Sequence, residues 1–118
     1  MTEAEMLQRT KNFAVRVIRV VQALPRADVA GILGRQLLRA GSSVGANYRA
    51  ACRAKSASDF INKLKIVEEE CDETVYWMEL LVEAGCLPLR RLDALMREAN
   101  ELLAIIVASI KTVRVRQS

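Results

Sequence analysis

The sequence predicts an all-α protein, an antiparallel up-down four-helix bundle built as one domain over residues 1–118. Apolar residues recur at three- and four-residue spacing through four long segments. Residue types that start and stop helices separate these segments, and no segment is a convincing strand. The links between the segments are short, which favours antiparallel packing of consecutive helices.

The first helix is expected from Thr2 to about Leu24. Thr2 can cap it, and two glutamates follow near the positive end of the helix dipole. Pro25 ends the run, because a proline disfavours the helical conformation in the residue before it. The apolar positions at helical spacing are Phe13, Val17, Val20, Val21 and Leu24.

The second helix is expected from a cap at Asp28 to about Ala54, and it contains the unusual stretch GSSVGAN at 41–47. Glycine inside a helix costs about 1 kcal/mol relative to alanine. Small residues at four-residue spacing let another helix backbone approach closely. The stretch therefore indicates close helix packing, against a helix of the same chain or of a neighbouring copy.

The third helix is expected to start at the cap Ser56-Ala-Ser58-Asp59, to run to about Ala84 and to stop at Gly85. Its apolar stripe consists of Leu64, Val67, Cys71, Val75, Met78 and Val82. Pro88 is expected to open the fourth helix, since proline favours the first turn. That helix continues towards the basic tail KTVRVRQS, through Leu92, Leu95, Met96, Ala99, Leu102, Leu103, Ile106 and Ile110.

Composition excludes several classes of protein. No run approaches the roughly 20 apolar residues that a membrane span needs, and the polar, acidic start differs from a signal peptide, so we expect a cytoplasmic protein without membrane contact. Three cysteines lack CxxC spacing, and the chain has no histidine. We therefore expect buried free thiols, no metal site, no cofactor and no catalytic residues. A carboxylate-metal bundle using Glu69, Glu70 and Glu73 would need Glu-x-x-His ligands, so an enzyme is not expected.

Charge is segregated along the chain. Eight acidic residues lie between Asp59 and Glu83, against Lys63 and Lys65. The rest of the chain holds sixteen basic and six acidic residues, a net charge of +10. This pattern favours either self-assembly through opposite charges or binding of a polyanion.

One face of the second helix is predicted to be basic. At 100° per residue, a stripe about 80° wide holds Arg35, Arg39, Ser42, Ala46, Arg49 and Arg53. With Arg114 and Arg116 in the tail and a pI of about 9.3, these arginines are candidates for contacts to RNA or DNA phosphates. The alternative is an ordinary solvated face, with some arginines paired to the acidic third helix.

The third helix has a second apolar face, formed by Ile66, Trp77 and Leu80. A helix that is apolar on two sides needs two partners. We expect this face, with Ser42 and Ala46, to contact another copy of the chain. The alternative is that the bundle itself wraps this helix more completely.

The central part of the chain resembles the bacterial four-helix-bundle family that includes the intervening-sequence proteins encoded within large-subunit ribosomal RNA genes. The motif Q-L-x-R-A-x-x-S-x-x-x-N is present at 36–47 and includes Arg39, Ser43 and Asn47. An S-x-x-D-F helix start follows at 56–60, and then the acidic segment that contains Trp77 and ends in ELL at 79–81. Fold relatives of this family are the accessory variability determinants of diversity-generating retroelements.

The resemblance implies a ring, commonly a homopentamer, with no known catalytic activity. In the retroelement branch, the basic ring binds nucleic acid and a reverse transcriptase, but the motif here is closer to the intervening-sequence type. We expect a non-enzymatic, homo-oligomeric protein that binds nucleic acid through phosphate contacts. The alternative is a structural or adaptor protein that recruits another protein. Ser43 and Asn47 are expected to form hydrogen bonds between helices rather than a ligand site.

Overall fold

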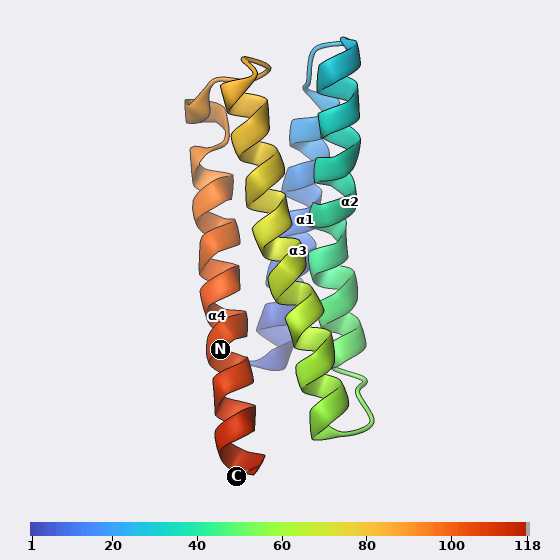
Figure 1. Ribbon diagram of the computed structural model, residues 1–118, viewed down its shortest axis with the longest axis vertical. Helices are drawn as coiled ribbons and strands as arrows, with labels where there is room; N and C mark the ends of the chain where they lie inside the picture. Colours follow the sequence, from blue (N-terminus) through green and yellow to red (C-terminus); the bar gives the residue numbers. More distant parts are fainter. Residues whose placement is uncertain (118) are drawn as a thin grey trace.

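The computed structural model describes residues 1–117, which form four long α-helices running up and down along one axis (Figure 1). The molecule measures 50 × 20 × 20 Å along its principal axes. No strand occurs within residues 1–117, so the predicted all-α bundle is confirmed. The elements are α1 (Glu3–Gln22), α2 (Asp28–Ala51), α3 (Ala57–Glu83), the short 3₁₀ helix η1 (Leu89–Arg91) and α4 (Asp93–Gln117).

Side-chain caps begin two of the helices as the sequence predicts. The hydroxyl of Thr2 accepts a hydrogen bond from the backbone N–H of Glu5 at 3.1 Å, and the Glu5 carboxylate accepts one from the Thr2 N–H at 3.3 Å. The hydroxyl of Ser56 likewise accepts from the Asp59 N–H at 3.0 Å. These bonds satisfy backbone donors that have no partner inside the helix.

The predicted cap at Asp28 is wrong by one residue. Ala27 occupies the capping position in an extended conformation, and no side chain caps α2. Asp28 is the first helical residue, where its charge still favours the helix dipole.

The predicted opening of the fourth helix at Pro88 is also wrong. Pro88 precedes η1 instead, and α4 begins at Asp93. The extra turn allows both Leu87, which is 7% exposed, and Leu92, which is fully buried, to enter the core. Gly85 ends the preceding helix with a φ of +75°, a conformation that glycine adopts without strain.

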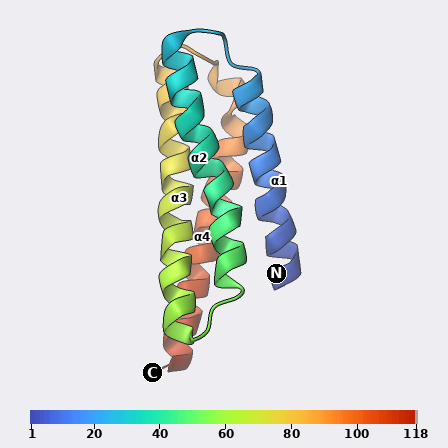
Figure 2. The same cartoon turned by 90° about the vertical axis from the view of Figure 1, so that its right-hand side faces the viewer.

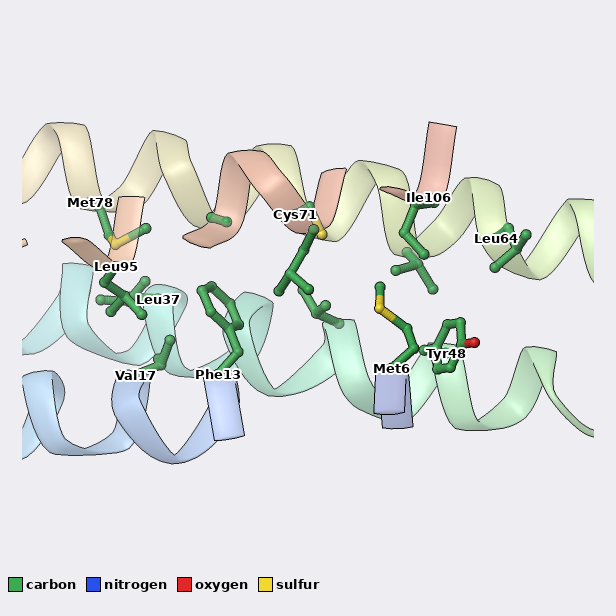
Figure 3. Packing of buried hydrophobic residues seen from close by; sticks show 14 of the residues in the cluster. Met6, Phe13, Val17, Leu37, Tyr48, Leu64, Cys71, Met78, Leu95 and Ile106 are labelled. Carbon is green, nitrogen blue, oxygen red and sulfur yellow. The ribbon is translucent and has the colours of Figure 1, made fainter. Parts of the chain in front are cut away.

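The core runs the length of the bundle, and all four helices contribute to it (Figure 3). In the predicted stripe of α3, four residues are buried, while Val75 and Val82 are only half-buried. Thr74 and Leu81 are fully buried instead. This shift arises because α3 packs extensively on both α2 and α4, so its buried face is wider than one stripe.

Three glycines of α2, Gly34, Gly41 and Gly45, face α1 of the same chain. A Cβ added to Gly34 would lie 2.7 Å from the Leu24 side chain, and one added to Gly45 would lie 3.3 Å from the carbonyl oxygen of Thr10. The small residues at 34–45 therefore allow α1 to approach the backbone of α2. The sequence left open whether these small residues pack against a helix of the same chain or of a neighbouring copy. The structure shows that they pack against a helix of the same chain.

No helix in the described part of the chain combines the length and the apolar character that crossing a bilayer requires.

Candidate nucleic-acid interface

The predicted basic stripe of α2 faces outward along its whole length. Figure 2 views the molecule from the side where α2 and α1 lie next to each other. The side chains of the stripe are all exposed: Arg35, Arg39, Ser42, Ala46, Arg49 and Arg53. These six residues therefore lie on one exposed surface, as their helical spacing predicts.

Beside this stripe, a groove of about 680 Å³ lies between α1 and α2. Small residues of both helices form much of it, because the close approach at Gly45 brings the two backbones together where no large side chain fills the surface. Three cations, Lys11, Arg49 and Arg53, line the same groove. The small lining residues are Ala4, Ala14, Ser42, Gly45 and Ala46.

Four cations of this surface have no acidic partner in the part of the chain that the structure describes. Lys11, Arg35, Arg49 and Arg53 form no ion pair with any residue from 1 to 117. Glu3 is the acidic residue that lines the groove. Three cations against one carboxylate leave the groove with a surplus of positive charge that can attract an anionic chain.

Arg39 has a different role from its neighbours in the stripe. Its guanidinium donates to Glu70 at 3.1 Å and also to Glu73, and both carboxylates belong to α3. The bond from Arg39 to Glu73, followed by one from the indole N–H of Trp77, lowers the pKa of Glu73 below its ordinary value. The charge of Arg39 is thus compensated within the chain, where it joins α2 to α3.

Ser43 and Asn47 make hydrogen bonds inside their own helix. The Ser43 hydroxyl donates to the carbonyl of Arg39 at 2.6 Å, and the Asn47 amide donates to the carbonyl of Ser43 at 2.8 Å. The expectation that they bond between helices is therefore wrong. Polar side chains one turn apart satisfy themselves on the preceding backbone turn without a second helix.

The groove also contains a thiol, which is unsuited to nucleophilic chemistry. Burial, followed by the nearby charge of Glu3, raises the pKa of Cys52. The sulfur therefore stays protonated near neutral pH, and the thiolate is the nucleophilic form. All three cysteines are free, and the described residues contain no group of three or more acidic or cysteine side chains placed to hold a metal ion.

The second apolar face of α3 is only partly covered. Ile66 is 41% exposed, whereas Trp77 and Leu80 are half-buried against the bundle. The Trp77 indole donates to Glu73 at 3.0 Å, and its ring meets Tyr76 edge-on at 5.2 Å. The three predicted contact residues share a face about 60° wide on the outside of α3.

Arg114 and Arg116 lie apart from the groove. Both are exposed in the last turn of α4, which extends beyond the other helices at the C-terminal end (Figure 1). Neither residue lines the groove.

One groove residue, Lys11, is absent from the sequence-based candidates. It lies on the helical wheel of α1 close to Leu7, Ala14 and Ile18. This small and apolar stripe could have been recognised as the partner of the α2 stripe, but the sequence does not show which helix lies beside α2.

The chain is similar to known proteins in both sequence and structure. A family model described as 23S rRNA-intervening sequence protein matches residues 2–108. The chain is also similar to a crystal structure of a protein with unknown function from the S23 ribosomal protein family of Bacteroides thetaiotaomicron VPI-5482, with 32% sequence identity and a TM-score of 0.87. That similarity covers 94% of this chain and 99% of the other. No curated protein matches. The resemblance carried by the central motif is thus confirmed.

Proposed function

The chain belongs to the 23S rRNA-intervening sequence protein family, and we propose that it is a non-enzymatic, homo-oligomeric basic bundle that binds nucleic acid through phosphate contacts. The observation that carries this proposal is the groove between α1 and α2, where Lys11, Arg49 and Arg53 have no acidic partner among residues 1–117. Its small lining residues leave room for a sugar-phosphate backbone to approach the helices.

The groove is suited to contacts with phosphates rather than with bases. Arginine guanidinium groups bind phosphate oxygens through paired N–H donors. No aromatic side chain lines the groove on which a base could stack. We therefore expect binding that depends steeply on salt and weakly on nucleotide sequence.

Subunit contacts are assigned to the outer face of α3, with Ile66, Trp77 and Leu80. Ser42 and Ala46, which the sequence suggested as contact residues, line the same groove as Lys11, Arg49 and Arg53. A neighbouring subunit seated on them would cover the nucleic-acid site. We therefore expect nucleic acid to bind in the groove and neighbouring subunits to contact the outer face of α3. The family resemblance implies a pentameric ring as the assembly.

The test is the affinity for a fluorescent RNA and a fluorescent DNA duplex, measured by anisotropy at several salt concentrations. The variant R49Q/R53Q should bind about tenfold more weakly or worse, and its salt slope should be smaller by about two. The matched control is R97Q, which removes an exposed arginine that is paired with Asp93 on α4. Equal affinities for wild type, R49Q/R53Q and R97Q would overturn the proposal.

A second candidate function is favoured by the exposed apolar side chains of α3. Tyr76, which is not among the assigned subunit contacts, is 52% exposed on this helix, so the oligomer could recruit another protein, for example a reverse transcriptase, as a structural adaptor. The 260/280 nm absorbance ratio of the purified protein separates the two functions. A raised ratio that high salt abolishes supports nucleic-acid binding, and a protein-only ratio at low salt supports the adaptor.

A further inference from the structure

A second basic hollow lies at the end of the bundle that carries the α1–α2 and α3–α4 links. It has a volume of about 160 Å³ and is lined by Arg19 and Val20 of α1, by Ala23 just after it, and by Leu87 and Arg91. Figure 1 shows the α3–α4 link and η1 at the top of the molecule, near the end of the bundle where α1 stops. The fold thus brings two arginines from distant parts of the sequence to the same small cavity.

The hollow has an apolar lining and no acidic lining residue. Arg19 and Arg91 are exposed and form no ion pair within residues 1–117. Arg26 and Arg90, in the adjoining links, are also exposed and likewise form no ion pair with the described residues. The carbonyl end of α1 contributes a partial negative charge of about one half, which two full positive charges outweigh.

This hollow is separate from the groove between α1 and α2. On α1, the residues that line the two sites point in directions about 150° apart, at 100° per residue. Val17 lies against Gly41, so the helical rise places Arg19 roughly 15–20 Å along the axis from Arg49 and Arg53. A nucleic acid that occupied both sites would have to pass around α1 as well as along it.

We propose that the hollow between Arg19 and Arg91 is a second phosphate-binding site, which takes a backbone phosphate of a second nucleic-acid segment. Two arginines, one from α1 and one from η1, line the same hollow, and guanidinium groups bind phosphate oxygens through paired N–H donors. With both sites occupied, one protomer holds two segments on opposite sides of α1. This inference rests on the proposed function, because it assigns the same class of ligand.

The experiment counts bound ligands per protomer, which does not depend on the number of subunits. A fluorescent hexanucleotide is titrated at low ionic strength into protein held well above the dissociation constant. We expect two hexanucleotides per protomer for the wild type, one for R19Q/R91Q and one for R49Q/R53Q. The control R97Q should bind two, and circular dichroism should show the same helix content in every variant.

The outcomes separate the two sites. If the wild type and R19Q/R91Q both bind one hexanucleotide and R49Q/R53Q binds none, the second site is refuted while the proposed function stands. If only R19Q/R91Q loses binding, the second site stands and the groove assignment fails.

A further arm adds inorganic phosphate at constant ionic strength. Selective loss of the Arg19–Arg91 hexanucleotide would identify free phosphate as the ligand and refute the nucleic-acid assignment of this hollow.

Discussion

Gly41 of α2 lies directly against Val17 of α1. A Cβ added to Gly41 would approach both Cγ atoms of Val17 to 2.8 Å, and Val17 is fully buried. Atoms of real side chains do not come this close, so the two helices can adopt their present distance only with glycine at this position. The contact explains why a helix contains a residue of such low helix propensity.

The substitution G41A should therefore destabilise the protein, although alanine is the better helix former. Forcing a methyl group against a packed valine costs roughly 1–3 kcal/mol, which the gain in propensity of about 1 kcal/mol only partly offsets. We expect a net loss of up to about 2 kcal/mol in the free energy of unfolding, measured by urea denaturation.

The matched control is G31A in the same helix. A Cβ there would meet only the Arg35 side chain, at an ordinary 3.7 Å, so this variant should gain about 0.5–1 kcal/mol. The double variant G41A/V17A should lose less than the sum of its single variants, because removing the Val17 methyl groups relieves the clash. Additive losses would contradict the account.

Low pH should weaken the contact between α1 and α4 that Arg9 and Glu98 form. The Arg9 guanidinium donates two hydrogen bonds of 2.7 Å to Glu98, and these bonds hold the pKa of Glu98 below its ordinary value of 4.5. A carboxylate with a depressed pKa stabilises the fold above its unfolded-state pKa and loses this effect as the pH falls through the lower folded-state value.

The variant E98Q should accordingly be about 1–2 kcal/mol less stable than wild type at pH 7. This difference should shrink as the pH falls below about 4.5. Parallel urea titrations across pH 2–7 measure it. E101Q is the control, since Glu101 is 68% exposed and lies 3.4 Å from Arg9. A stability difference for E98Q that does not change with pH would refute the role of its ionisation.

Arg39 and Arg49 should separate stability from binding. R39Q breaks the ion pairs with Glu70 and Glu73 and should lower the unfolding free energy by about 1 kcal/mol, while it changes nucleic-acid affinity less than twofold. R49Q should weaken nucleic-acid binding and leave the unfolding free energy nearly unchanged, because Arg49 has no acidic partner within the described chain. Urea denaturation measures the unfolding free energy and anisotropy measures the affinity on the same samples. Equal loss of affinity in both variants would contradict the different roles given to Arg39 and Arg49.

Cys71 should react with a maleimide only when the protein unfolds. Its side chain is fully buried, and burial raises the pKa of the thiol to about 12. Cys52 and Cys86 are half-buried and should react earlier. Timed labelling followed by peptide mass spectrometry gives the order, with C71A as the control that removes the slow phase. Labelling of Cys71 at the rate of Cys86 would show that the centre of the bundle opens locally.

I66E should dissociate the oligomer without unfolding the bundle. Ile66 is 41% exposed, so a charge there is tolerated in the monomer but is costly in a subunit contact. Light scattering on a sizing column should give a wild-type mass near five times 13.2 kDa and a smaller mass for I66E. V115E, at an exposed position in the last turn of α4, is the control. A wild-type monomer would refute the ring.

The helices could be predicted from the sequence because the interactions that start and end them are local. Thr2 and Ser56 cap residues three positions away, and Gly85 breaks its helix through its own backbone conformation. The apolar periodicity likewise marks the buried faces, and the exposed stripe of α2 follows from the same 100° rotation per residue. The errors at Asp28 and Pro88 concern only where a helix begins.

Within the candidate site, the sequence by itself determined which side chains of α2 face outward. Only the tertiary structure decided which of them carry free charge. Arg39 meets two carboxylates because α3 lies beside it, whereas Arg49 and Arg53 border the groove with Lys11 because α1 lies there. Periodicity describes one helix about its own axis, but ion pairs and grooves form between helices, and their pairing is fixed only when the shared core closes.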